Sequence, residues 1–359
     1  MRTQFLMASI FWLMATITFN AYSAPGESIV LDPNTGDYLI TYYGTGALGN
    51  KKNKILRKEI FVPATKIDPS VKSTFKLKED GTIVYKYQIT NGSKSKQPLV
   101  MLMFDPVTSI IETVPMPIRD PSLDAHAFEQ IYLAGKAALT TPDGWGGTNF
   151  EKQVGKLRIS WVYENLDSLS DGLAQGTTQT GFGFSSKDIP GIGIAQLRGH
   201  SPGGQGYVDE GPSGEIGDQV FQLEQNNYVS RNAAVPTIPV PTPFDPAVIL
   251  ERIQTQMHTW IAMNLLDAAF ASQLDRYFQS AISAYRLNQP KVGKQQIEAM
   301  RELIKKEQPD LGRDEEHESD KNQEKNDDRK SALIGKLAAR VLDFDLKYVT
   351  KRMSGDKDD

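Results

Sequence analysis

The sequence predicts a mostly β amino-terminal sandwich followed by a separate all-α helical bundle. Upstream of Asn232, apolar and polar residues alternate with a period of two, which is typical of β-strands. Downstream of Asp245, apolar residues recur every three or four positions, which is typical of amphipathic helices. Between these parts a dense group of prolines interrupts both patterns and predicts an extended linker over residues 233–246. These prolines are Pro236, Pro239, Pro241, Pro243 and Pro246.

The first 23 residues have the features of a secretory signal peptide. Arg2 provides a positive charge, residues 5–19 are apolar, and Ala21-Tyr22-Ser23 offers small residues at the two positions that signal peptidase reads. An uncleaved membrane anchor is the alternative, but a spanning helix needs about 20 apolar residues. We therefore expect a secreted or periplasmic bacterial protein with no membrane span once the signal is removed.

Composition narrows the function classes further. The chain of 359 residues contains no cysteine, so each fold depends on its core without disulfides, and zinc sites of the thiolate type are excluded. The formal net charge of −4 argues against general nucleic-acid binding. We expect no cofactor and no nucleic-acid partner.

Residues 24–232 are predicted to form an immunoglobulin-like β-sandwich. Short segments of alternating or β-branched residues are separated by Gly, Asn and Asp turns, which favours antiparallel sheets. One hairpin is especially clear, because Asp80-Gly81 separates two alternating segments. The predicted strands are 37–43, 73–78, 83–89, 98–104, 157–163, 181–186 and 192–197.

Residues 247–353 are predicted to form the bundle. Asp245-Pro246 is a strong start signal, with Asp as the N-cap and Pro in the first turn. Four amphipathic segments follow, centred on residues 250–261, 270–285, 292–304 and 334–349. The segment 310–330 interrupts them with nine acidic and five basic residues, and we predict that it is disordered. A calcium-binding or partner-binding tail is the alternative for this segment.

Three groups of residues are candidates for function. Asp120, Asp124, His126 and Glu129 form a compact titratable cluster, which would serve a hydrolase of envelope polymers if the protein were an enzyme. A solvated polar loop and helix face explains the cluster better, and we expect neither a catalytic site nor a metal site there.

Aromatic residues form the second group. Trp145 lies in a glycine-rich segment and, with Tyr132 or Tyr163, is a candidate for stacking on a sugar ring. The alternative is a loop tryptophan that folds back over the core.

The third group is a basic run, Lys51, Lys52, Lys54, Arg57 and Lys58, with five positive charges in eight residues. It is a candidate contact for a polyanion such as lipopolysaccharide, teichoic acid or nucleic acid. Lysines that protect an edge strand from aggregation are the alternative.

The helical part resembles the small FIMAH-type domain of exported bacterial proteins. Trp260-Ile261, Leu274, Ala281-Ile282, Gln296-Ile297 and Met300 carry the resemblance, and the charged segment before the last helix departs from it. The upstream part resembles the sandwich regions that accompany such domains, at Tyr85-Lys86-Tyr87, Pro142-Asp143-Gly144-Trp145, Trp161 and Gly181-Phe182-Gly183-Phe184. The resemblance implies a non-catalytic extracellular module.

The expected function is therefore binding or surface display, with a glycan or another envelope protein as partner. Two alternatives remain open, the envelope-polymer hydrolase and a structural matrix protein that self-associates.

Overall fold

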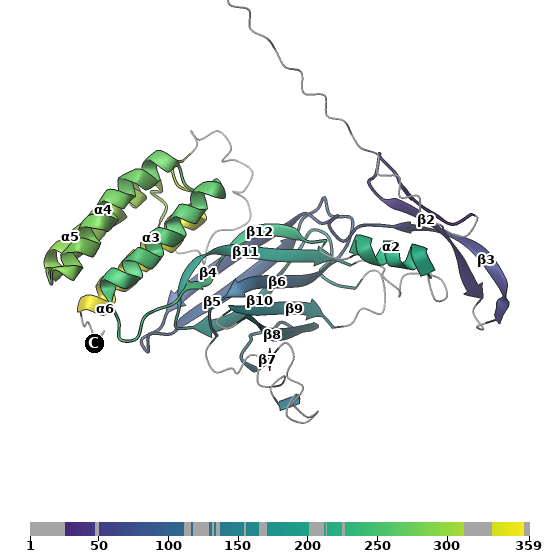
Figure 1. The fold of residues 1–359 in the computed structure, drawn as a ribbon, viewed down its shortest axis with the longest axis horizontal. Helices are drawn as coiled ribbons and strands as arrows, with labels where there is room; N and C mark the ends of the chain where they lie inside the picture. Colours follow the sequence, from purple (N-terminus) through teal and green to yellow (C-terminus); the bar gives the residue numbers. More distant parts are fainter. Residues whose placement is uncertain are drawn as a thin grey trace, which may run out of the picture. The chain divides into compact units, whose positions relative to one another are not determined.

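A computed structural model describes residues 26–46, 50–110, 116–117, 129–130, 133, 137–153, 156–164, 171–200, 212, 214–224, 227–311 and 332–354. The predicted signal peptide lies outside these residues, as does the charged segment beyond Leu311. The contacts divide the chain into two compact units. Unit 1 comprises Met1–Val62 and Pro202–Gln225, and unit 2 comprises Pro63–Ser201 and Asn226–Asp359 (Figure 1).

Unit 1 is a three-stranded antiparallel sheet covered on one face by a helix. Its strands are β1 (Ser28–Leu31), β2 (Tyr38–Gly46) and β3 (Asn50–Phe61), in that order. The helix is α2 (Gly214–Glu224), which packs Ile216 and Val220 against the sheet. A helix was not expected at this point of the sequence, and its sheet lies more than 150 residues earlier in the chain.

Unit 2 contains two further sheets. The three-stranded sheet has the order β10-β5-β4, with β4 at Pro69–Leu77, β5 at Ile83–Asn91 and β10 at Thr177–Ser186. The six-stranded sheet has the order β12-β11-β6-β9-β8-β7, and only its β7–β8 pair is parallel. Its strands are β6 (Leu99–Val107), β7 (Met116–Pro117), β8 (Trp145–Gln153), β9 (Lys156–Tyr163), β11 (Ile189–Gly199) and β12 (Val229–Ile238).

Aromatic side chains from both sheets form one core. Tyr87 of β5 lies 4.4 Å from Phe104 of β6, measured between ring centroids, and Trp161 of β9 stacks with Phe184 of β10 at 6.4 Å. The period-two pattern of β5 explains this placement, because alternate residues from Ile83 to Ile89 are buried. The predicted hairpin is confirmed: Leu77 pairs with Ile83 across the Asp80-Gly81 turn.

The four predicted helices are confirmed as α3 (Pro246–Ala262), α4 (Ala268–Arg286), α5 (Pro290–Glu307) and α6 (Lys336–Ser354). The carboxylate of Asp245 accepts hydrogen bonds from the backbone N–H groups of Ala247 and Val248, as expected of an N-cap. The ends of the charged segment are held together, because Gln308 Nε2 donates to the Ile334 carbonyl at 2.7 Å.

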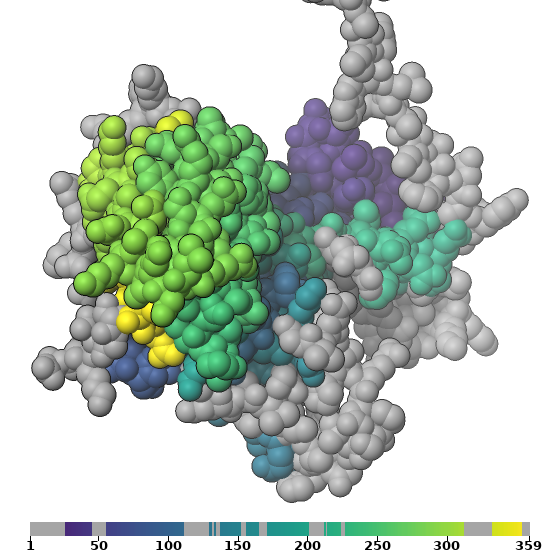
Figure 2. All heavy atoms as spheres, turned by 60° about the vertical axis from the view of Figure 1, so that its left-hand side comes forward, coloured from purple at the N-terminus to yellow at the C-terminus, as the bar shows by residue number. Residues whose placement is uncertain are grey.

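The helices do not form the separate bundle that the sequence predicts. Helices α3 and α6 contact β11 and β12, and one continuous cluster of buried residues extends from the sheets into the helices. The reason is visible in α6, which buries residues around most of its circumference and so needs packing partners on more than one side. Only parts of α6 (yellow) show at the surface beside the green helices in Figure 2.

The predicted linker is also shorter than expected, since its first residues belong to β12. Pro236 pairs with Pro190 of β11, and neither residue has an N–H to donate. The Pro236 carbonyl instead accepts from the backbone N–H of Thr108 at 2.9 Å and from its hydroxyl at 3.0 Å. Because β12 is the terminal strand of its sheet, it tolerates this proline.

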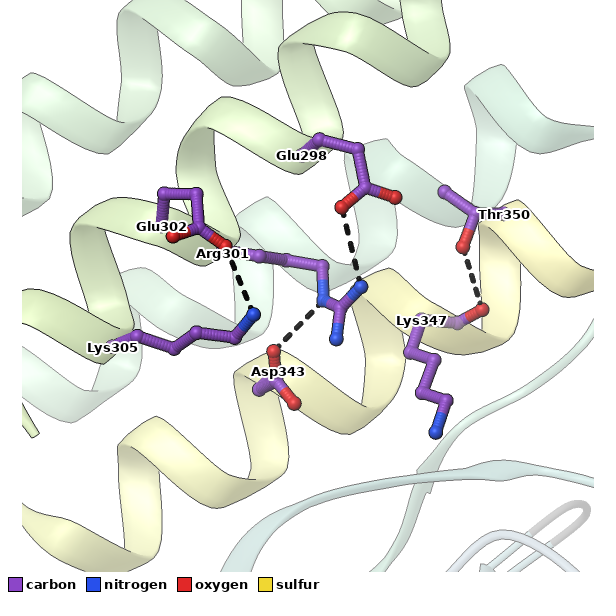
Figure 3. Close-up of polar contacts among 7 residues, drawn as sticks. All are labelled: Glu298, Arg301, Glu302, Lys305, Asp343, Lys347 and Thr350. Carbon is purple, nitrogen blue, oxygen red and sulfur yellow. Dashed lines mark hydrogen bonds and ion pairs between the residues drawn. The ribbon is translucent and has the colours of Figure 1, made fainter. Parts of the chain in front are cut away.

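An ion pair fixes α6 against α5 (Figure 3). Arg301 Nε donates to Asp343 Oδ1 at 2.8 Å, and Arg301 Nη1 lies 3.3 Å from Glu298 Oε2. The Arg301 side chain is mostly buried, which by itself would lower its pKa, but the hydrogen bond to Asp343 and the charges of Asp343, Glu298 and Glu302 together raise the pKa. The last helix is therefore part of the bundle despite the charged segment that precedes it.

Candidate binding surface

The structure places Trp145 in the core and not at a sugar-stacking surface. The side chain is 4% exposed, and its ring meets Tyr163 and Phe182 edge to face, with centroids 5.6 Å and 5.0 Å apart. The Trp145 backbone N–H donates to the Pro142 carbonyl, so the chain turns sharply and Trp145 begins strand β8. The stacking role is thus corrected to a packing role. Tyr132 lies outside the described residues.

The titratable cluster is largely outside the described residues. Asp120, Asp124 and His126 are not among them, and Glu129 is exposed. Within the part of the chain that the structure describes, no group of three or more His, Cys, Asp or Glu residues is arranged to hold a metal ion.

The basic run lies in strand β3. Lys58 is exposed and pairs with Thr41 of β2, whereas Arg57 is half-buried and pairs with Tyr42. The backbones of Lys51, Lys52 and Lys54 belong to the same strand, and their side chains lie outside what the structure describes. The run is therefore a strand with one edge unpaired within its three-stranded sheet.

The sheet of unit 1 has an apolar face that α2 does not cover. Val30 of β1, Leu39 of β2 and Ile60 of β3 are direct cross-strand neighbours, and their side chains are 54%, 41% and 67% exposed. Leu56 and Lys58 share this face, because they alternate with Ile60 along β3. We call these five residues the open face.

The opposite face of the same sheet is buried under α2. Ile40, Tyr42 and Phe61 pack there against the helix, and all three are fully buried. Helix α2 carries Glu215, Asp218 and Glu224 and no basic residue. On β3, Glu59 pairs with Ile40 and Arg57 with Tyr42, so both lie on the face that α2 covers, whereas Lys58 pairs with Thr41 and lies on the open face.

Sequence reasoning did not find the open face, although a signal for it exists. Leu39 and Ile40 are adjacent aliphatic residues in one strand, so they must lie on opposite faces of the sheet. A strand that is apolar on both sides needs a covering layer on both sides. Four of the twelve large apolar side chains that are exposed among the described residues lie on this one face, namely Val30, Leu39, Leu56 and Ile60.

A second feature missed from the sequence is a buried carboxyl group in unit 2. Asp345 of α6 is 0% exposed, and neither of its carboxyl oxygens has a hydrogen-bond partner. Burial raises its pKa well above the usual value. Burial likewise raises the pKa of the Tyr85 and Tyr348 phenols, and the nearby Asp345 adds a smaller contribution to each. The position of Asp345 could have been inferred, since Val341, Leu342, Tyr348 and Val349 surround it at helical spacing.

In contrast, Asp188, which follows β10, is well bonded. Its carboxylate accepts hydrogen bonds from the Ser109 hydroxyl at 2.6 Å and the Val240 backbone N–H at 3.1 Å. Its carbonyl accepts from the Tyr85 hydroxyl at 2.8 Å. Asp188 therefore connects the segments that contain Tyr85, Ser109 and Val240, and its role is structural.

No protein family matches the sequence, and no curated protein is found to resemble it. A search of solved structures finds a cohesin module from Clostridium perfringens ATCC13124 family 33 glycoside hydrolase, at 11% identity and a TM-score of 0.22. The match covers 47% of this chain and 98% of that one. A TM-score of this size does not establish a shared fold. Among the described helices, none is long and apolar enough to cross a membrane.

Proposed function

We propose that this is an exported, non-catalytic protein that binds another component of the bacterial envelope through the open face of unit 1. The observation that carries the proposal is the row formed by Val30, Leu39 and Ile60, which lies uncovered across all three strands. Exposed apolar patches on folded proteins are typically interaction sites, because leaving them in water is unfavourable.

Unit 2 acts as the scaffold in this proposal. We infer that its two sheets form a β-sandwich and that the helices extend the core at one side. The FIMAH-type resemblance of the helices agrees with a module that has no catalytic residues of its own. The mixed core gives the scaffold rigidity, because neither the sheets nor α6 can separate without exposing buried aromatic residues.

The hydrolase alternative depends on Asp120, Asp124 and His126, which lie outside the described residues. The ring of Trp145 is packed in the core and leaves no face on which a glycan could stack. Self-association through the open face would instead give a dimer that forms as the protein concentration rises.

The test compares binding of the mature chain to isolated bacterial envelope fractions. We expect Leu39→Ser combined with Ile60→Ser to abolish binding. Leu287→Ser is the matched control, because Leu287 is 68% exposed, like Ile60, but lies after helix α4. Equal binding by the parent and the double variant would refute the proposal.

Mass spectrometry of the exported chain shows in the same preparation whether cleavage follows Ser23.

A further inference from the structure

We propose that the open face docks on a membrane leaflet that carries anionic headgroups. The aliphatic row would enter the boundary between headgroups and acyl chains, and basic residues of β3 would contact the headgroup phosphates. This inference rests on the proposed function, and it names the chemistry of the partner.

The aliphatic row has the geometry of a surface that can insert into a lipid interface. Val30, Leu39 and Ile60 lie side by side on adjacent strands, so their side chains project from the same face of the sheet. Leu56 extends this surface along β3. A soluble glycan or a nucleic acid would leave these aliphatic side chains in water, whereas the lipid interface removes them from it.

The open face also carries a positive charge, because Lys58 of β3 lies on it. Residues 51–58 contain five basic residues, and Lys58 is exposed between Leu56 and Ile60 on the open face. The acidic Glu59 that follows pairs with Ile40 and lies on the opposite face. The acidic residues of α2 lie on the helix that covers the opposite face. An anionic surface is therefore attracted to Lys58 on the open face, whereas the opposite side carries Glu59 and the acidic residues of α2 beside Arg57.

A neutral protein partner explains the aliphatic row but not the basic run. A dissolved polyanion explains the basic run but not the aliphatic row. A leaflet with anionic headgroups explains both, because interfacial binding combines buried apolar area with electrostatic attraction.

The experiment is co-sedimentation of the mature full chain with vesicles. One set contains phosphatidylcholine alone, and the other contains phosphatidylcholine mixed with phosphatidylglycerol. We expect binding to the anionic vesicles to be at least about tenfold tighter and to weaken as salt is added. We expect Lys58→Gln to weaken it about fivefold and Ile60→Ser about tenfold.

Two control variants match these changes in residue type and exposure. Lys294→Gln removes an exposed charge from α5, and Leu287→Ser removes an exposed leucine after α4. Neither is expected to change vesicle binding. Circular dichroism of each variant shows whether it is folded.

Equal binding to both vesicle types, or unchanged binding by folded Ile60→Ser, would overturn the inference. So would a concentration-dependent dimer in sedimentation equilibrium that Ile60→Ser abolishes, since the occupant would then be a second copy of the chain. If the open-face variants lose envelope binding but the parent ignores anionic vesicles, the proposed function stands and the lipid partner is wrong.

Discussion

Phe344 of α6 meets Phe75 of β4 edge to face, with ring centroids 4.9 Å apart and planes at 83°. The guanidinium of Arg340, one helical turn earlier, lies 5.6 Å from the centroid of the same Phe75 ring. Arg340 Nη2 also donates to the Ser73 carbonyl at 3.0 Å. The last helix is thus joined to one of the first strands of unit 2 by an aromatic pair, a cation–π contact and a hydrogen bond.

We predict that the sheets and helices of unit 2 unfold together. Trp145 and Trp161 report on the sheets and Trp260 on the helices, and all three are buried. In urea, tryptophan fluorescence and far-ultraviolet circular dichroism should show a shared transition for this unit. A double-mutant cycle of Phe75→Leu and Phe344→Leu should give a coupling of about 0.5–1.5 kcal/mol. Helices that melt before the sheets would contradict the shared core.

We predict that Asp345 makes unit 2 less stable as the pH rises. In the unfolded chain this carboxyl titrates near 3.8, whereas burial raises its pKa in the folded protein. Between these two pKa values the folded state holds a proton that the unfolded state has lost, so the free energy of unfolding falls as pH increases. Asp345→Asn should flatten this dependence in urea titrations at a series of pH values.

A second variant separates charge from packing at this position. Asp345→Leu should raise the free energy of unfolding by about 1–3 kcal/mol at neutral pH, because it removes a buried polar group that lacks hydrogen bonds. If Asp345→Leu lowered the free energy of unfolding, and Asp345→Asn left its pH dependence unchanged, the carboxyl would be solvated.

We predict that the Arg301–Asp343 pair contributes to the docking of α6 on α5. Both side chains are mostly buried, at 15% and 23% exposed, so solvent screens their interaction only in part. A cycle of Arg301→Met and Asp343→Asn should give a coupling of about 1–2 kcal/mol in urea unfolding. The pair Lys305–Glu302 on the same helix is the control, and its exposure should leave no measurable coupling. Equal couplings for the two pairs would contradict this account.

We predict that Trp145 is needed for stability and not for ligand binding. Trp145→Ala should lower the free energy of unfolding by about 3–5 kcal/mol, because it removes a ring packed against Tyr163 and Phe182. Trp145→Phe keeps part of this packing and should cost less. If folded Trp145→Phe lost affinity for a glycan array that the parent binds, a stacking role would return.

The parts predicted correctly depend on residues that are close in sequence. The alternation from Ile83 to Ile89 determines which face of β5 is buried, and Asp80-Gly81 closes its hairpin. The cap at Asp245 likewise needs only the next three residues. For the candidate site, the sequence located the basic run of β3 but not the aliphatic row beside it, because that row is defined by strand pairing.

Local pattern alone therefore determined the positions of most strands and helices, their buried stripes and their turns. Tertiary structure decided where the helices pack: α2 returns to cover the first sheet, and α6 packs against β4 and β11. It also decided which side chains are enclosed, since Trp145 faces inward and the Asp345 carboxyl is buried without a hydrogen-bond partner. The physical reason is that burial depends on which surfaces meet. A period in the sequence shows which side of an element is apolar, but not which distant element covers it.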